Sequence, residues 1–315
     1  MPLPNSEGTD FKRSTRGTRR RSPTPPPPTE PRGDTLDLTV LVDNNTLIDR
    51  YFIGEPGLSI LLHADGKRIL FDTGYSDAVI RNAESMGISL LNLDYIVLSH
   101  GHLDHTWGLT HLVRHLTEAT LEGREHAVPQ LIAHPACFYP RSKPPLAGTG
   151  ILMSAERIGQ HMPVRATTEP FWISKNLVFL GEIPRRFPFE RAEPGQRRIV
   201  MPDGRIEPDQ IIDDSALAYR CTDGLVIITG CSHSGICNIT EYARDICKER
   251  RIVDIIGGLH LLNPSPEQME GTCKYLRDAA PQALHACHCT SFEAKLKLAG
   301  SCPVKETGVG LRLKY

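Results

Sequence analysis

The stretch that most constrains the fold of this chain lies at residues 94–109 and reads DYIVLSHGHLDHTWGL. Residues 95–98 form a short apolar, partly β-branched run, which is typical of a buried strand. The strand is followed at once by SHGHLDH, which places three imidazoles and one carboxylate within six residues. Side chains just past a strand end can converge on one point. The stretch therefore predicts a polar site at the edge of a sheet.

The residue types in this loop favour a metal site. Neutral imidazole nitrogen and carboxylate oxygen are ligands that borderline divalent metals take. His100 and His102 can reach one ion, while Asp104 and His105 can reach a second. Gly101 carries no side chain, so the loop can fold tightly around the ions. The alternative is a polar loop that happens to be rich in histidine, and with 13 His in 315 residues it fits this pattern poorly.

Three further predicted strands each end in a histidine. A lone histidine at a strand end is more often a structural residue than a ligand. A binuclear site, however, needs ligands from outside the first loop. We therefore predict His233 and His288 as metal ligands. His260 follows two glycines that permit close backbone approach, and we predict it as a catalytic residue that contacts the substrate.

The pattern H-x-H-x-D-H after an apolar strand resembles the metallo-β-lactamase superfamily. This resemblance implies an α/β (α+β) fold, a four-layer αββα sandwich with a one- or two-metal site at one edge. The superfamily includes hydrolases, nucleases, oxygen-handling enzymes and transferases, so the fold alone does not determine the substrate.

Further motifs resemble one branch of that superfamily, the branch around the archaeal dihydropterin–ribofuranosylaminobenzene 5′-phosphate synthase. That enzyme joins a dihydropterin diphosphate to an aminobenzene ribosyl phosphate. The resemblance implies that the histidines and aspartate of SHGHLDH form the metal site together with the downstream histidines. The motifs occur in one order within residues 35–315: FDTG (71–74), SHGHLDH (99–105), HPACF (134–138), GEIPRR (181–186), DDSAL (213–217), TGCSHSGICN (229–238), GGLHL (257–261) and HCT (288–290).

One position departs from the superfamily pattern. Many members have an aspartate that bridges the two metal ions, directly after a Thr-Gly pair at the end of a strand. In this chain the corresponding pair, Thr229-Gly230, is followed by Cys231. A thiolate can bind zinc, but a buried, inert thiol is equally consistent with the sequence. The second metal position is therefore open at this point.

The predicted site indicates a metal-dependent enzyme. A divalent ion lowers the pKa of bound water and polarises a phosphoryl oxygen. We expect a hydrolase, or a transferase that displaces diphosphate, acting on a small anionic substrate, with Asp104 both binding metal and orienting water. Candidate phosphate contacts are His134, Arg141 and Arg185, since Arg matches phosphate geometry bidentately. Zinc suits the His-rich ligands, and iron and manganese fit almost as well.

Three rival functions are consistent with parts of the sequence. A nuclease needs a broad basic groove, and the formal net charge of -1 argues against nucleic acid as a partner. A thioester hydrolase of the glyoxalase II kind shares H-x-H-x-D-H but fits the downstream motifs poorly. The third rival is a non-enzymatic, metal-stabilised scaffold whose N-terminal tail binds a partner.

Composition divides the chain into two parts. Residues 1–34 are rich in Pro and Arg and predict a disordered tail, while residues 35–315 predict one domain. Within it, residues 140–215 predict a loop-rich insertion over the site or a plain surface excursion. No membrane span or signal peptide is visible, and the nine cysteines contain no C-x-x-C. We expect a cytoplasmic protein, with nuclear import through the basic tail as the alternative.

Overall fold

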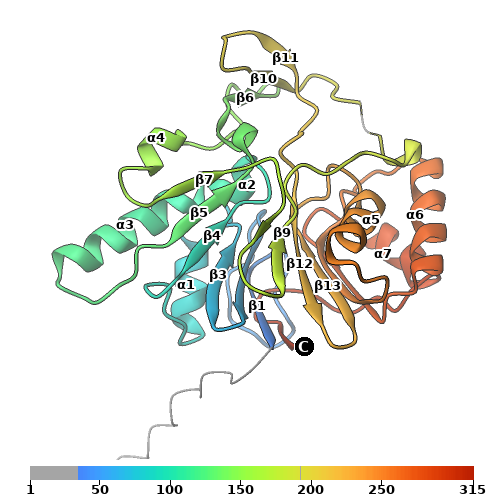
Figure 1. The fold of residues 1–315 in the computed structure, drawn as a ribbon, viewed down its shortest axis with the longest axis horizontal. Coiled ribbons are helices and arrows are strands. Elements are labelled where there is room, and N and C mark those ends of the chain that lie inside the picture. The colour runs from blue at the N-terminus through green and yellow to red at the C-terminus, as the bar shows by residue number, and fades with distance from the viewer. Residues whose placement is uncertain (1–34, 192) are drawn as a thin grey trace, which may run out of the picture. The chain divides into compact units, whose positions relative to one another are not determined.

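The computed structural model describes residues 35–191 and 193–315, so the predicted tail lies outside the described residues. Two sheets face each other, and helices cover both outer faces (Figure 1). Side chains from both sheets meet in one apolar layer that includes Phe71, Phe179 and Ile228, all fully buried. This is the αββα arrangement of layers that the sequence predicts.

The first sheet has seven strands in the order β16-β1-β2-β3-β4-β5-β7. Helix α3 buries Leu109, Leu112 and Val113 against its outer face, as a stripe at helical spacing requires. The elements are β1 (Leu36–Val42), β2 (Ser59–Ala64), β3 (Lys67–Phe71), α1 (Ala78–Ser85), β4 (Tyr95–Val97), α2 (Leu103–Thr106), α3 (Gly108–Leu121), β5 (Gln130–Ala133), β7 (Val164–Ala166) and β16 (Arg312–Lys314).

The second sheet has six strands in the order β15-β14-β13-β12-β9-β8. Its outer face packs against three helices through side chains such as Ile239, Leu276 and Leu298. The elements are β8 (Phe171–Trp172), β9 (Leu177–Phe179), β12 (Ala216–Cys221), β13 (Gly224–Thr229), α5 (Ile236–Cys247), β14 (Ile252–Gly258), α6 (Pro266–Ala279), β15 (Ala283–Cys287) and α7 (Phe292–Ala299).

Parallel pairing brings the ends of distant strands to one edge. In the first sheet β3, β4, β5 and β7 run parallel, and in the second sheet β13, β14 and β15 do so. The carboxyl ends of parallel strands lie at the same edge of a sheet, which is where α/β proteins place their sites. The loops that follow these strands carry all the histidines that the sequence predicts as ligands.

Residues 140–215 are more regular than the sequence suggests. Strand β7 extends the first sheet beside β5, and β9 pairs with β12 in the second sheet. The inserted part is a small third sheet in the order β11-β10-β6, drawn above the edge of the sandwich in Figure 1. Its strands are β6 (Arg141–Ser142), β10 (Arg198–Val200) and β11 (Ile206–Pro208), and the neighbouring short helices are η1 (Pro135–Phe138), α4 (Ala155–Ile158) and η2 (Pro188–Glu190).

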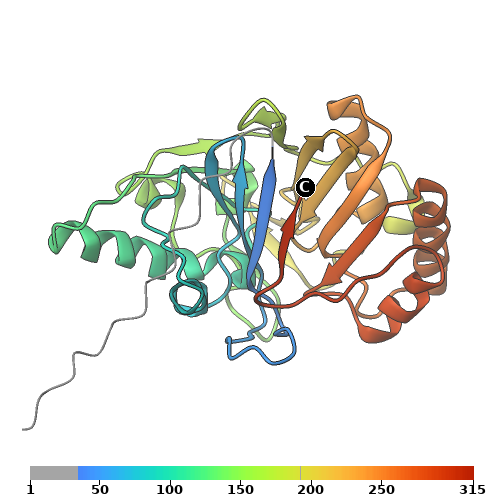
Figure 2. The same cartoon turned by 90° about the horizontal axis from the view of Figure 1, so that it is seen from below.

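Two features of the secondary structure depend on contacts between distant segments. Helix α5 begins at Ile236, and Glu190 accepts hydrogen bonds from the backbone N–H groups of Cys237 and Asn238 in its first turn. The last strand, β16, pairs antiparallel with β1, as the red and blue strands of Figure 2 show. Val309 forms only an isolated bridge with Thr46.

None of the helices in the described part of the chain has the length and apolar character that a membrane span requires.

Candidate metal centre

Asp72 holds the loop that follows β4. It comes directly after β3 and has a positive φ of 56°, which is uncommon for a residue other than glycine. Its Oδ1 accepts a hydrogen bond from the Ser99 backbone N–H at 2.7 Å, and its Oδ2 accepts one from the Ser99 hydroxyl at 2.7 Å. Oδ2 also lies 2.6 Å from His105 Nδ1. Asp72 therefore orients the His105 ring so that Nε2 faces the centre.

A second buried carboxylate holds the same loop from the other side. The Gly101 N–H donates to Asp213 Oδ2 at 2.7 Å, and Asp213 Oδ1 lies 2.6 Å from Arg141 Nη2. A Cβ at Gly101 would lie 2.3 Å from the Cys137 carbonyl oxygen, which no real structure tolerates. Glycine is therefore required between the two histidines of this loop.

The first cluster of donor atoms consists of His100, His102 and His233, which we call the three-histidine group. His100 Nε2 lies 2.9 Å from His102 Nδ1, and His233 Nε2 lies 3.2 Å from the same atom. Burial lowers the pKa of His102 to about 3 and holds the pKa values of His100 and His233 well below the usual range. These imidazoles are therefore neutral, which is the form that binds metal.

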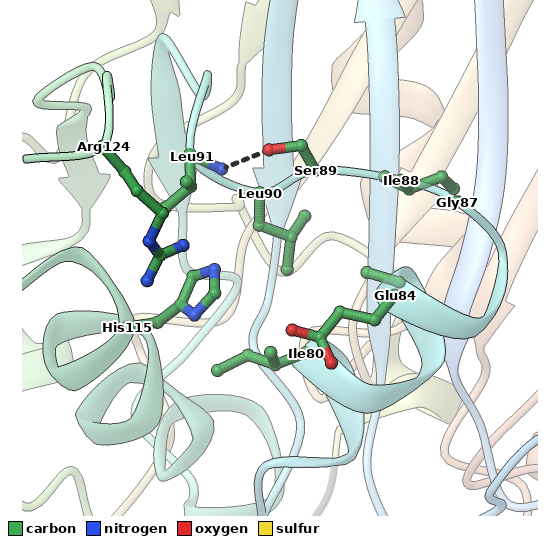
Figure 3. Close-up of a pocket in the computed structure, with 10 residues that line it drawn as sticks. Ile80, Glu84, Gly87, Ile88, Ser89, Leu90, Leu91, His115 and Arg124 are labelled. Carbon is green, nitrogen blue, oxygen red and sulfur yellow. Dashed lines mark hydrogen bonds between the residues drawn. The ribbon is translucent and has the colours of Figure 1, made fainter. Parts of the chain in front are cut away.

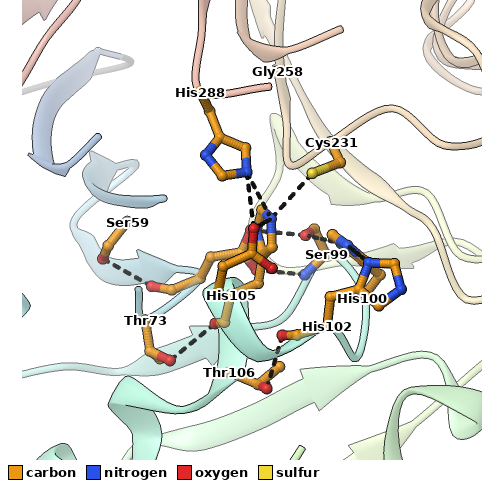
Figure 4. A network of polar contacts seen from close by, with 12 residues as sticks. Ser59, Thr73, Ser99, His100, His102, His105, Thr106, Cys231, Gly258 and His288 are labelled. Atoms are coloured by element: carbon orange, nitrogen blue, oxygen red, sulfur yellow. Dashed lines mark hydrogen bonds and ion pairs between the residues drawn. The ribbon is translucent and has the colours of Figure 1, made fainter. Parts of the chain in front are cut away.

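The second cluster consists of Asp104, His105, Cys231 and His288, which we call the mixed group. His105 Nε2 lies 3.2 Å from both Cys231 Sγ and His288 Nε2, and Asp104 Oδ2 lies 3.3 Å from His288 Nε2. Figure 4 shows the His105, Cys231 and His288 side chains pointing toward one another.

The mixed group favours positive charge at its centre. Burial would lower the pKa of His105, but the carboxylates of Asp72 and Asp104 outweigh burial and raise this pKa to about 9. Burial raises the pKa of the Cys231 thiol, so this side chain becomes a thiolate only when a cation binds beside it. A divalent cation is thus the natural occupant of this cluster.

His288 is fixed by residues that the sequence did not single out. Its backbone N–H donates to Asp43 Oδ1 at 2.8 Å, and its Nδ1 lies 3.1 Å from Asn44 Oδ1. Both residues follow β1, where the sequence indicated only a strand end. Nothing in a single sequence reveals a contact between residues that lie more than two hundred positions apart.

His260 lies beside both clusters. Its ring centroid is 4.2 Å from that of His233, and its backbone φ is 50°. Its ligand nitrogen also lies within 4.8 Å of the sulfurs of Cys231 and Cys289. Cys289 was not among the site residues predicted from the sequence, although it follows His288 directly in the HCT motif.

The three predicted phosphate contacts are placed differently from one another. Arg141 has a fully buried side chain paired with Asp213, so it supports the metal loop and does not face a ligand, which corrects the expectation from sequence. His134 is also buried, with its Nδ1 accepting the Ala136 N–H and its Nε2 3.3 Å from Glu182 Oε2. Only Arg185 is open to solvent, and it donates from Nη2 to the Ile211 carbonyl oxygen at 3.1 Å.

Arg185 lines a hollow of about 470 Å³ on the inserted region, together with Arg191, Glu182 and Glu193. A second hollow of about 310 Å³ lies against α1 and α3 and is lined by residues such as His115 and Arg124 (Figure 3). The second hollow contains none of the predicted site residues. The first contains one predicted site residue, Arg185, and is lined by two guanidinium groups and two carboxylates.

The fold and the sequence both identify the family. The chain belongs to the metallo-β-lactamase superfamily, whose model matches residues 53–245. Members are mostly metal-dependent hydrolases, and the donor clusters described above are of the kind that divalent metals use. The predicted fold class is thereby confirmed.

Three relatives narrow the position of the chain within the superfamily. An uncharacterized protein of Methanocaldococcus jannaschii is 30% identical, over 83% of this chain and 93% of the relative. The 7,8-dihydropterin-6-methyl-4-(beta-D-ribofuranosyl)-aminobenzene-5′-phosphate synthase of the same organism is 28% identical, over 83% of this chain and 90% of the enzyme. A crystal structure described as a metal-dependent hydrolase of the beta-lactamase superfamily has a TM-score of 0.74 and 27% identity, covering 88% of this chain and 98% of that one. The branch that the sequence motifs indicated is confirmed.

Proposed function

We propose that this protein is a binuclear metal-dependent enzyme that acts on a small anionic substrate carrying a phosphate or diphosphate. The observation that carries the proposal is the convergence of two separate donor clusters, one of three residues and one of four, contributed by loops at the ends of strands from both sheets. One cluster would suffice for a structural ion. Two adjoining clusters are the arrangement that phosphoryl chemistry uses to hold both the attacking and the leaving oxygen.

In this proposal the three-histidine group holds one ion and the mixed group holds the second. Cys231 takes the position of the bridging aspartate and binds as a thiolate. Imidazole and thiolate together favour zinc over iron or manganese, because softer ligands select softer metals. Burial keeps the imidazoles of His100 and His102 in the neutral form that binds metal.

The chain's own residues position the reactants. Bound zinc supplies a water molecule of lowered pKa and polarises the phosphoryl oxygen. Asp104, which is partly exposed, orients that water through its carboxylate while it also binds metal. His260 contacts the substrate beside His233, and Arg185 binds the anionic end of the substrate. Arg141 and Asp213 act indirectly, by holding the loop between His100 and His102.

A transferase that displaces diphosphate is the second candidate reaction. The relative named as a synthase matches 83% of this chain, and the compound in its name carries a 5′-phosphate. The relative described as a hydrolase supports the simpler reaction, attack by water. Both reactions use the same two clusters and differ in whether water or a second substrate attacks.

The test is turnover on a panel of phosphomonoesters, phosphodiesters and diphosphate esters, using zinc-loaded wild-type protein. His102→Ala should abolish turnover, whereas His161→Ala, which changes an exposed histidine outside the two clusters, should leave it unchanged. Metal binding without turnover on any member of the panel would contradict the proposal and support a metal-stabilised scaffold.

The role of Arg185 has its own test. Arg185→Ala should raise KM without loss of metal, because the guanidinium bonds to the backbone carbonyl of Ile211 and belongs to neither metal cluster. Arg205→Ala is the matched control, since Arg205 is exposed and pairs with Asp203 on the same inserted region. Unchanged kinetics in Arg185→Ala would remove this residue from the proposed site.

A further inference from the structure

A third set of donor atoms adjoins the two clusters. Cys231, His260 and Cys289 bring two sulfurs and one imidazole nitrogen within 4.8 Å of one another. They follow β13, β14 and β15, three neighbouring parallel strands, so the sheet itself holds them together. We call them the sulfur-rich group. It shares Cys231 with the mixed group, whereas His260 and Cys289 belong to neither cluster described above.

The backbone is built to admit the second sulfur. A Cβ at Gly258 would lie 2.5 Å from Cys289 Sγ, so only glycine leaves room for the thiol. The His260 N–H points at the same sulfur at 3.2 Å, and Cys289 Sγ lies 3.5 Å from the Cys231 carbonyl oxygen. These contacts hold the Cys289 sulfur in the group and fix its direction.

His260 has donor capacity that its surroundings leave unused. Its Nδ1 is buried and has no hydrogen-bond partner among the described residues. A buried polar atom without a partner is costly, and a missing ion is one reason for such an atom. This observation is independent of the distances between the sulfurs, and it too points to a ligand.

We propose that Cys231, His260 and Cys289 form an additional, inhibitory site for a thiophilic divalent cation such as Cd²⁺ or excess Zn²⁺. Two sulfurs and one imidazole are soft ligands, which select such ions over Mg²⁺, Ca²⁺ or Mn²⁺. When the ion binds, the Cys289 S–H bond breaks, its proton passes to solvent and a metal–sulfur bond forms. No oxidant or reductant is needed.

Inhibition follows from the two shared residues. An ion in the sulfur-rich group takes the His260 imidazole away from the substrate and engages Cys231, which the mixed group also uses. The inhibitory part of this inference rests on the proposed function, whereas the binding part does not. Metal binding is therefore measured first, without substrate.

The experiment is equilibrium dialysis of the full chain against Cd²⁺ under a non-chelating phosphine reductant, with cadmium counted per chain. Cys289→Ser should bind about one ion fewer than wild type and should lose part of the near-ultraviolet sulfur-to-cadmium absorption. Cys302→Ser is the matched control, because Cys302 and Cys289 are both 8% exposed. The control should bind as many ions as wild type. Equal cadmium content in wild type and Cys289→Ser would overturn the proposal.

A second variant distinguishes loss of the metal site from misfolding. His260→Gln keeps the size of the side chain, and it should lose the same ion while circular dichroism stays unchanged. Retention of that ion in His260→Gln would also overturn the proposal.

If wild type binds the Cys289-dependent ion but turns over no phosphoester, the proposed function fails while the additional site stands. If excess Zn²⁺ inhibits wild type and Cys289→Ser equally, the inhibitory role fails.

Discussion

The three-histidine group and the mixed group adjoin each other, with the rings of His100 and His105 only 4.3 Å apart between centroids. Their electrostatics nevertheless differ. Burial keeps the first group neutral, whereas the carboxylates of Asp72 and Asp104 make the second a place where positive charge is stabilised. The first group should therefore bind its ion through lone pairs alone, and the second through charge as well.

Their supports also differ. The three-histidine group depends on a close backbone approach at Gly101 and on the buried pair of Arg141 with Asp213. The mixed group depends on Asp72, which is hydrogen-bonded directly to the ring of His105. A substitution in one of these supports should therefore disturb metal binding by one group more than by the other, and this difference can be measured.

The largest expected effect comes from removing a ligand of either group. His100→Ala or Cys231→Ala should each lower kcat by on the order of a thousandfold, because stabilisation of several kcal/mol by one ion is lost. Steady-state kinetics on zinc-loaded protein would measure this effect. A Cys231→Ala enzyme with wild-type kcat would mean that the thiol is an inert neighbour and that the mixed group lacks a sulfur ligand.

Asp72→Asn should act mainly on the mixed group. The neutral amide would polarise the Nδ1–H of His105 less than the carboxylate does and would place no negative charge near the ion, so metal affinity there should fall roughly 10–100-fold. Competition with a coloured chelator would measure the two affinities separately. If Asp72→Asn lowered the metal affinities of both groups to the same extent, the proposed difference between their supports would be wrong. Ser99→Ala is the contrasting variant, since it removes one hydrogen bond that Asp72 accepts and also the 2.9 Å contact of the Ser99 hydroxyl with His100 Nδ1, so it should affect both groups.

Gly101→Ala should act first on the three-histidine group. The added Cβ would lie 2.3 Å from a carbonyl oxygen, so the loop must shift, at a cost of about 1–3 kcal/mol in the free energy of unfolding. Gly148→Ala is the matched control, because nothing lies within 4 Å of its added Cβ. Urea denaturation of both variants would measure the difference, and equal free energies of unfolding would refute the crowding at Gly101.

The smallest expected effect concerns Glu190, which caps the helix that follows Cys231 and His233. Burial, opposed by hydrogen bonds from Cys237 and Asn238, raises the pKa of Glu190 to about 7. A folded-state pKa above the unfolded value means that the stabilisation is complete below about pH 4.5 and is lost as pH rises through about 7.

The variant Glu190→Gln does not titrate and isolates this contribution. Between about pH 4.5 and 7, wild type should lose on the order of 1–3 kcal/mol of unfolding free energy relative to the variant. Urea titrations at several pH values, with chelator present so that metal release does not contribute, would measure it. A difference that stays constant with pH would show that Glu190 is charged in the folded state throughout.

The sequence predicted the parts of the site that are local. Residues 95–105 form one strand, a short loop and the start of α2, so the donor pattern is visible without tertiary structure, and His233 and His288 follow strands with clear apolar runs. The parallel pairing that brings these strand ends together follows from the αββα fold. For this reason the ligand positions and the fold class could be predicted together.

The rest could not be read from the sequence, because it depends on contacts between distant segments. Asp213 supports Gly101 from 112 residues away, and Glu190 caps α5 from a different loop. Strands β8 and β9 are two and three residues long, too short for a periodic pattern. Arg141 was expected to bind phosphate because a guanidinium group matches phosphate geometry, but its side chain is fully buried beside the Asp213 carboxylate.

The central claim is that each group holds its own ion. The most direct test is metal content per chain, by native mass spectrometry, for wild type, His233→Ala and Cys231→Ala after loading with zinc and removal of excess. The account predicts about two ions in wild type and about one in each variant, with the surviving ion in a different group. About one ion in all three proteins would contradict it, because His233 and Cys231 would then lie outside the coordination of that ion.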